Sequence, residues 1–259
     1  MDLRETTTAG TPRHPWEIGR ADFFCRLMAQ SMCPNGPVHV LDIGSGDAYL
    51  AERLISRLPD RSRVICVDPN YPDDMLADRT FGANSKLCRV REAPDGQYDW
   101  VLLLDVLEHV EDDTALLREQ LPRLSAQGRV LVSVPAWQAL YSEHDVRLGH
   151  RRRYAPSDLR RLVEAAGLDI QLMGGLFALL LLPRSLSKAA EVFGGYRAMS
   201  PSGPRSDHVR TAVTQWSLGG LSTRLVTKAL ALDGALCLAA ARRSVSLPGL
   251  SAWALAERS

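Results

Sequence analysis

The sequence contains no hydrophobic run long enough to cross a membrane. Its longest apolar stretch, GGLFALLLLP at residues 174–183, is ten residues long, whereas a membrane-spanning helix needs about 20. Residues 1–20 also lack the apolar core of a secretory signal peptide. We therefore expect a cytoplasmic protein without a transmembrane span, for which only peripheral contact with a membrane remains open.

Metal-binding and disulfide patterns are missing as well. The five cysteines are scattered without CxxC spacing, and several stand in apolar runs, which is typical of buried thiols in a reduced protein. The six histidines show no His-x-x-x-His spacing and pair with no cysteine cluster. The sequence therefore predicts no metal site.

The chain also lacks an excess of charge of either sign. Its formal net charge is +1, so no global field attracts nucleic acid or an anionic membrane. A short basic run, HRRRY at residues 150–154, could hold phosphate groups, but one such run more often pairs with the acids of its own chain. We expect a small-molecule partner and no nucleic acid.

Short β-type runs alternate with helical patterns along most of the chain. The run WVLLLD at residues 100–105 is apolar at consecutive positions, which is typical of a strand covered by helices on both faces of a parallel sheet. The alternation predicts an α/β fold, a Rossmann-like, doubly wound, mostly parallel seven-stranded sheet with helices on both faces. Strands are expected near residues 39–44, 63–68, 98–105, 128–135, 168–172 and 250–257, and helices near residues 49–58, 112–124 and 156–166.

The stretch VLDIGSGDA joins a strand to a helix through two glycines, Gly44 and Gly46. Such a turn brings backbone N–H groups and a helix N-terminus close to a ligand. Asp42 would repel a pyrophosphate at this turn and would attract a cation, and Tyr49 stands where nicotinamide enzymes place a third glycine. Asp68, at the end of the second strand, can accept hydrogen bonds from both ribose hydroxyls. A nicotinamide-dependent oxidoreductase is the disfavoured alternative.

The motifs LDIGSGDA, VICVDP, YDWVLLLDVLEHVEDD and GRVLVSVP follow one another over residues 38–172. In order and spacing they resemble the motifs of class I S-adenosylmethionine-dependent methyltransferases. Ala48, at the usual third small position of the first motif, is a mild departure. The resemblance implies S-adenosyl-L-methionine as cofactor and S-adenosyl-L-homocysteine as its product. The residues that it implies for cofactor binding in these motifs are Asp42, Gly44, Gly46, Asp68, Pro69, Asp105 and His109.

Three further segments resemble the small-molecule methyltransferases of types 11 and 12. They are HPWEIGR near the N-terminus, SVPAWQALYSEHDVRLGHRRRY from the end of the strand expected at residues 128–135, and LPGLSAWALAE near the C-terminus. The resemblance implies that the first segment covers the cofactor with Trp16 and Arg20. Simpler roles remain open: these two residues could pack a leading helix, Asp105 could cap a helix, and His109 could pack in the core.

The change of composition near Gly174 indicates an insertion between the last two strands. We divide the chain into an N-terminal helical lid segment (1–36), a cofactor-binding core (37–173), an apolar helical substrate cap (174–247) and the last strand of the core (248–259). The cap predicts a hydrophobic acceptor, with Phe177 and Trp216 as substrate-binding residues. A homodimer interface is the alternative use of its apolar faces.

Titratable residues gather on the loop that follows the strand expected at residues 128–135, where open α/β sheets bind ligands. His144 and His150 are the first candidates for a catalytic base because imidazoles titrate near neutrality, and Tyr141 and Glu143 come next. Arg152 and Arg153 are expected to form structural ion pairs, Asp145 being one partner. The predicted function is O-, C- or N-methylation of a small metabolite. The alternative is a cofactor-binding protein that does not methylate, either a cyclisation catalyst or a structural or regulatory module.

Overall fold

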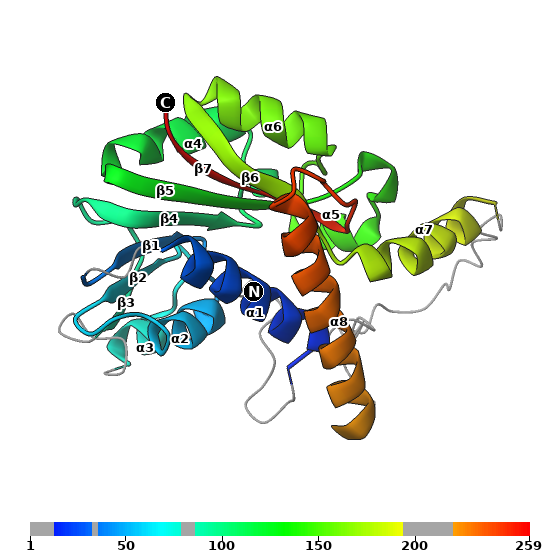
Figure 1. The fold of residues 1–259 in the computed structure, drawn as a ribbon, viewed down its shortest axis with the longest axis horizontal. Coiled ribbons are helices and arrows are strands. Elements are labelled where there is room, and N and C mark those ends of the chain that lie inside the picture. Colours follow the sequence, from blue (N-terminus) through cyan, green and yellow to red (C-terminus); the bar gives the residue numbers. More distant parts are fainter. Residues whose placement is uncertain (1–12, 33–35, 79–85, 194–219) are drawn as a thin grey trace, which may run out of the picture.

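The computed structural model describes residues 13–32, 36–78, 86–193 and 220–259. Its seven strands are β1 (His39–Ile43), β2 (Arg63–Val67), β3 (Leu87–Val90), β4 (Tyr98–Leu104), β5 (Leu124–Pro135), β6 (Leu168–Leu176) and β7 (Ser251–Arg258). They form one sheet in the order β3-β2-β1-β4-β5-β7-β6 (Figure 1). The first five strands pair in parallel, and β7 pairs antiparallel with both β5 and β6. The predicted fold class is confirmed.

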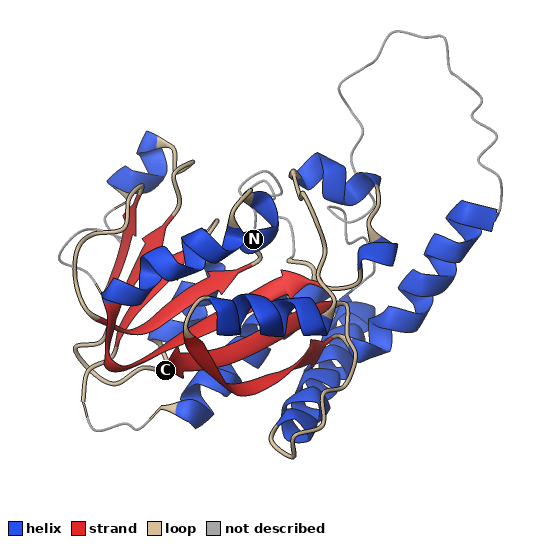
Figure 2. Ribbon diagram, turned by 90° about the horizontal axis from the view of Figure 1, so that it is seen from above, coloured by secondary structure: helices blue, strands red, loops and turns tan. Residues whose placement is uncertain are grey.

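Helices cover both faces of this sheet (Figures 1 and 2). The α-helices of the described residues are α1 (Pro15–Ser31), α2 (Tyr49–Ile55), α3 (Asp73–Ala77), α4 (Asp113–Gln120), α5 (Glu143–Leu148), α6 (Pro156–Ala165), α7 (Ala178–Phe193) and α8 (Gly220–Ala241). The helix α8 lies beside α1, and α7 extends away from the sheet (Figure 1). No helix of the described residues is both long and apolar enough to cross a bilayer.

The strands divide their side chains between two hydrophobic cores. Val40 and Leu102 belong to the core beneath α1, α2 and α8, whereas their chain neighbours Leu41 and Leu103 belong to the core beneath α4 and α6. Successive residues of a strand point to opposite faces, so a strand that is apolar at every position feeds both cores. This division is why the continuous apolar runs correctly predicted a doubly covered sheet.

Two helix ends follow from local sequence. The helix α6 begins with Pro156 at its first position, and the carboxylate of Asp158 accepts the N–H of Ala155 at 3.1 Å. It ends just before Gly167, whose φ of +90° is left-handed. The helix α4 is shorter than expected because Pro122 interrupts the helical hydrogen bonds, and a 3₁₀ turn, Leu121–Arg123, replaces its last turn.

Three strands differ from the expectation. The fifth strand, β5, begins at Leu124, four residues before its expected start. The third strand, β3, occupies a stretch whose polarity had hidden it. The sixth strand, β6, continues past residue 172 to Leu176 through two glycines. Gly175 is required there because a Cβ would lie 2.4 Å from the carbonyl oxygen of Leu247. The glycine therefore marks a close backbone approach inside the strand and not the end of the strand.

Candidate functional site

The predicted acidic residues meet at one edge of the sheet. Asp42 lies in β1, Asp68 directly follows β2, and Asp105 directly follows β4, and these parallel strands all end on the same side. A cavity of about 500 Å³ opens at this edge, and a smaller one of about 50 Å³ adjoins it. Trp16, Arg20, Gly44 and Leu104 line both cavities.

The glycine turn lies where β1 and β4 end side by side. Gly44 has a φ of +66°, and its N–H donates to the carbonyl oxygen of Val67 at 2.8 Å. A Cβ on Gly44 would lie 2.6 Å from Cγ2 of Val106, so a glycine is required for two reasons. Ala48, just before α2, also has a positive φ of +66°, a conformation that a glycine would adopt without the steric penalty of a Cβ.

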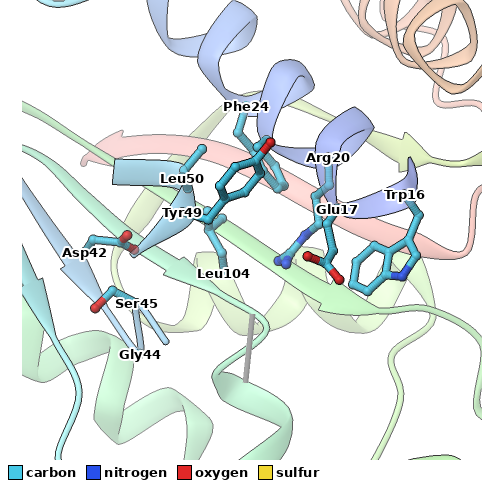
Figure 3. A pocket seen from close by; sticks show the side chains of 11 residues that line it. Trp16, Glu17, Arg20, Phe24, Asp42, Gly44, Ser45, Tyr49, Leu50 and Leu104 are labelled. Carbon is cyan, nitrogen blue, oxygen red and sulfur yellow. The ribbon is translucent and has the colours of Figure 1, made fainter. Parts of the chain in front are cut away.

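Opposite charges face one another across the smaller cavity. Asp42 is only 3% exposed, and burial raises its pKa to about 7, with nearby Asp68 adding to the rise and Arg20 opposing it. The Nη2 atom of Arg20, on α1, lies 2.7 Å from Oδ2 of Asp105. The buried Nε of Arg20 has no hydrogen-bond partner among the described residues. Figure 3 shows Trp16, Glu17 and Arg20 projecting from α1 beside Leu104 and the glycine turn.

Asp68 connects the second strand to the glycine turn. Its Oδ2 accepts the N–H of Gly46 at 3.3 Å, and its Oδ1 accepts the N–H of Asn70 at 2.9 Å. Asp68, Pro69 and Asn70 all line the larger cavity, so the carboxylate is held in place at the cavity wall. Gly46 supports this carboxylate and lines neither cavity.

Asp105 does not cap a helix, which was the simpler role that the sequence had left open. It has a φ of +59° and accepts the hydroxyl of Ser133 at 3.1 Å in addition to pairing with Arg20. The helix α4 is capped by Asp112 instead, whose Oδ1 accepts the N–H of Ala115 at 2.8 Å. The carboxylate of Asp105 is therefore directed by side chains toward the cavity that it lines.

Of the four candidate bases on the loop after β5, two line the larger cavity and two do not. His144 and His150 line the larger cavity. The hydroxyl of Tyr141 instead donates to the carbonyl oxygen of His150 at 2.7 Å, and Glu143 is exposed and pairs with Arg147 at 3.2 Å. Burial lowers the pKa of His144, so its imidazole is neutral at pH 7 and able to accept a proton.

Asp145 is the buried centre of this loop. It accepts hydrogen bonds from the N–H of Ser142 at 2.9 Å and from Nε of Arg153 at 2.8 Å, and its Oδ1 lies 2.9 Å from Nδ1 of His150. Although burial by itself would raise the pKa of Asp145, the hydrogen bonds from His150 and Arg153 hold it well below its usual range. The expected ion pair of Arg153 is confirmed, and Arg152 pairs with Asp113 at 3.1 Å.

The insertion contributes one wall of the larger cavity. Phe177 has a φ of +65° and packs edge-on against Trp16, with 6.4 Å between ring centroids, and Phe177, Leu180 and Arg184 line the cavity. Trp216 lies outside the described residues. The outward side of the insertion exposes leucines, including Leu182 at 68%; peripheral membrane contact and dimerisation through this surface stay predictions.

Sequence reasoning did not single out three residues of this region. Asn70 and Arg184 line the larger cavity, and Glu108 is fully buried behind it. Burial, reinforced by the nearby charge of Asp105, raises the pKa of Glu108 well above its usual range. Glu108 stood next to the predicted His109 in the motif VLEHV, but only the tertiary structure shows its surroundings.

Residues 20–172 match the model of a protein family described as "Methyltransferase domain". An uncharacterized methyltransferase of Mycobacterium bovis is 34% identical over 111 residues, which cover 40% of this chain and 53% of that protein. A ubiquinone biosynthesis O-methyltransferase of Bradyrhizobium diazoefficiens is 36% identical over 104 residues, 38% of this chain and 40% of that protein. The chain spans about half the length of the curated relatives it matches.

Solved structures share the fold across nearly the whole chain. A plantazolicin methyltransferase in complex with S-adenosylhomocysteine superposes with a TM-score of 0.52 at 15% identity, covering 95% of this chain and 85% of that one. The cyclase SpnF superposes with a TM-score of 0.50 at 17% identity, covering 92% and 81% of the two chains. At this level of identity, both likenesses concern the fold alone.

Proposed function

Because the chain belongs to the class I S-adenosylmethionine-dependent methyltransferases, we propose that it methylates a small, largely apolar acceptor in the larger cavity. The observation that carries this proposal is the convergence of Asp42, Asp68, Asp105 and Arg20 at the sheet edge, next to a wall of apolar side chains. The family membership leaves no support for a nicotinamide-dependent oxidoreductase.

The residues at the sheet edge fit S-adenosylmethionine. Arg20 offers a buried Nε without a partner among the described residues, which suits the carboxylate of an amino acid. Asp42 and Asp105 suit its ammonium and sulfonium charges, and Asp68 suits the ribose hydroxyls. The bound cofactor supplies an activated methyl group and a good leaving group; the protein's part is to align the acceptor with that methyl and to exclude water.

We assign proton acceptance to His144 rather than to His150. Both nitrogens of His150 face carboxylates, with Nδ1 at 2.9 Å from Asp145 and Nε2 at 4.0 Å from Glu108. His144 lines the cavity, and burial lowers its pKa. A hydroxyl acceptor therefore loses its proton to His144. The reaction we propose is O-methylation, the activity after which one relative is named.

The proposal is tested with purified protein, S-adenosylmethionine and a panel of apolar hydroxylated compounds. Formation of S-adenosylhomocysteine together with an acceptor heavier by one methylene, both measured by mass spectrometry, would support it. Binding of S-adenosylhomocysteine without methylation of any acceptor would favour a binding module. Conversion of an acceptor without consumption of cofactor would favour a cyclisation catalyst.

Replacing His144 by glutamine is expected to lower kcat by about 10²- to 10⁴-fold, the usual contribution of a general base, with little change in the Kd of S-adenosylhomocysteine. In the wild type, kcat/KM should rise with pH through a value below about 6.5, the ordinary pKa of histidine, because burial lowers the pKa of His144. This limb should disappear in the variant. The exposed His39→Gln is the control; an unchanged pH profile in His144→Gln would exclude this base.

Replacing Phe177 by alanine is expected to raise the KM of the acceptor roughly tenfold without lowering kcat, because an apolar contact made equally in the ground and transition states is lost. Steady-state kinetics measures both constants. Leu182→Ala, a change on the exposed face of α7, is the control. Since Phe177 is buried, thermal unfolding should be recorded in parallel; an unaltered KM in a folded variant would remove the insertion from the acceptor site.

A further inference from the structure

Three potential metal ligands from two separate loops meet at the wall of the larger cavity. Glu108 and His109 belong to the 3₁₀ turn Leu107–His109, which follows β4, and His150 follows α5. One carboxylate oxygen and one nitrogen from each imidazole all lie within 4.8 Å of one another. The rings of His109 and His150 meet edge to face, with 4.8 Å between centroids, and both line the cavity.

The carboxylate of Glu108 is buried without a hydrogen-bond partner among the described residues. Its side chain is 0% exposed, and neither carboxylate oxygen has a hydrogen-bond partner among the described residues. A buried carboxylate without partners is unfavourable unless it holds a proton or contacts a cation. The nearby guanidinium groups already have acidic partners, since Arg20 pairs with Asp105 at 2.7 Å and Arg153 pairs with Asp145 at 2.8 Å.

His150 is oriented as metal-binding histidines usually are. Its Nδ1 lies 2.9 Å from Oδ1 of Asp145, which fixes the proton on Nδ1 and leaves the lone pair on Nε2. That Nε2 faces Oε1 of Glu108 at 4.0 Å. A carboxylate behind the second nitrogen of a histidine fixes its ring and strengthens its other nitrogen as a ligand.

We propose that Glu108, His109 and His150 bind a divalent transition-metal ion on the wall of the acceptor cavity. Two imidazoles and one carboxylate suit ions such as Zn²⁺ or Co²⁺ better than Mg²⁺ or Ca²⁺, which prefer oxygen ligands throughout. Ligand atoms about 2.1 Å from one ion lie at most about 4.2 Å apart, so the observed spread of 4.8 Å closes with a small side-chain rotation. Three protein ligands leave coordination positions open toward the cavity.

An ion at this position would contact the acceptor. Its open coordination positions would bind an oxygen or nitrogen atom of the acceptor and would favour the deprotonated form of a hydroxyl. This second role rests on the proposed methylation, whereas binding of the ion does not. The sequence predicted no metal site because regularly spaced ligands within one segment are absent, and these three residues come together only through the packing of two loops.

The test is titration of metal-stripped, full-length protein with Co²⁺, followed by calorimetry and by the visible absorption of bound Co²⁺. We expect one equivalent to bind, at least tenfold more weakly in Glu108→Gln and in His150→Gln, and 10- to 100-fold more weakly in Asp145→Asn, which alters the carboxylate behind the ligand. His39→Gln, an exposed histidine, should bind as the wild type does. Circular dichroism confirms that each variant is folded, and His109→Gln replaces any that is not.

The proposal is overturned if Co²⁺ does not bind, or if it binds equally well to Glu108→Gln and His150→Gln. It is also overturned if Glu108→Gln is more stable than the wild type and binds Co²⁺ unchanged, because Glu108 would then hold a proton. Titration of the same samples with S-adenosylhomocysteine separates the two proposals. Cofactor binding without metal binding would remove the metal site and leave the methyltransferase proposal intact.

Discussion

Replacing Asp145 by alanine is expected to lower the free energy of unfolding by about 3–5 kcal/mol, as removal of one partner from a buried ion pair typically does. The change leaves Nε of Arg153, Nδ1 of His150 and the N–H of Ser142 without their acceptor. Urea unfolding at pH 7 measures the loss. Asp73→Ala, which removes an exposed ion pair with Arg91, is the matched control and should cost less than about 1 kcal/mol.

The loss of stability in Asp145→Ala is expected to depend on pH. Hydrogen bonds hold the pKa of Asp145 below its ordinary value in the folded protein. Its contribution to stability is therefore complete above about pH 4, the ordinary pKa of aspartate, and declines as the pH falls toward the folded pKa. The difference between wild type and Asp145→Ala should shrink below about pH 4. A difference as small as that of Asp73→Ala at pH 7 would contradict the structural role of Asp145.

Replacing Asp68 by alanine is expected to weaken binding of S-adenosylhomocysteine by about 10- to 100-fold. Hydrogen bonds to a charged group contribute about 1.5–3 kcal/mol, and 1.4 kcal/mol corresponds to a factor of ten. The variant also removes the acceptor of the Gly46 and Asn70 N–H groups, which loosens the turn beneath the ligand. Calorimetric titration measures the change in Kd.

Two controls make this measurement decisive. Asp95→Ala removes an exposed carboxylate on the loop before β4 and should leave the Kd unaltered. Titration of the wild type with NAD should give no binding. An unaltered Kd in Asp68→Ala would mean that the ribose lies elsewhere, and a preference for NAD would overturn the assignment of the cofactor.

Most of the sheet was predictable because buried parallel strands are apolar at consecutive positions. The runs at β1, β2, β4 and β5 each feed two cores, and this pattern is visible in the chain itself. The third strand was not predictable in this way, since β3 lies at the edge of the sheet and half of its residues are only partly buried. The end of β6 was not predictable because a glycine in the sequence can indicate either a turn or close packing inside a strand, and Gly175 does the second.

The candidate site likewise contains residues whose placement could be predicted from the sequence and residues whose placement could not. Asp42, Gly44 and Asp68 stand next to strand ends, and strand ends of a parallel sheet meet at one edge, so their proximity followed from the strand assignments. Tyr141 stood beside His144 and His150 as a second-choice candidate base, but its hydroxyl donates to the backbone carbonyl of His150 in the same loop. The packing of an irregular loop decides which of its side chains face a cavity. A loop has no periodic pattern in the sequence from which these directions could be predicted.

The sequence by itself determined the fold class and, through its resemblance to a known family, the cofactor, and it predicted the edge of the sheet where the candidate site lies. Each of these depends on short-range patterns of apolar, glycine and acidic residues. The tertiary structure decided what distant residues do together: Arg20 with Asp105, Asp145 with Arg153, and Glu108 with His150. The strength of such pairs depends on distance and burial, which the order of residues does not contain. The most specific chemistry of this chain therefore lies in contacts between segments.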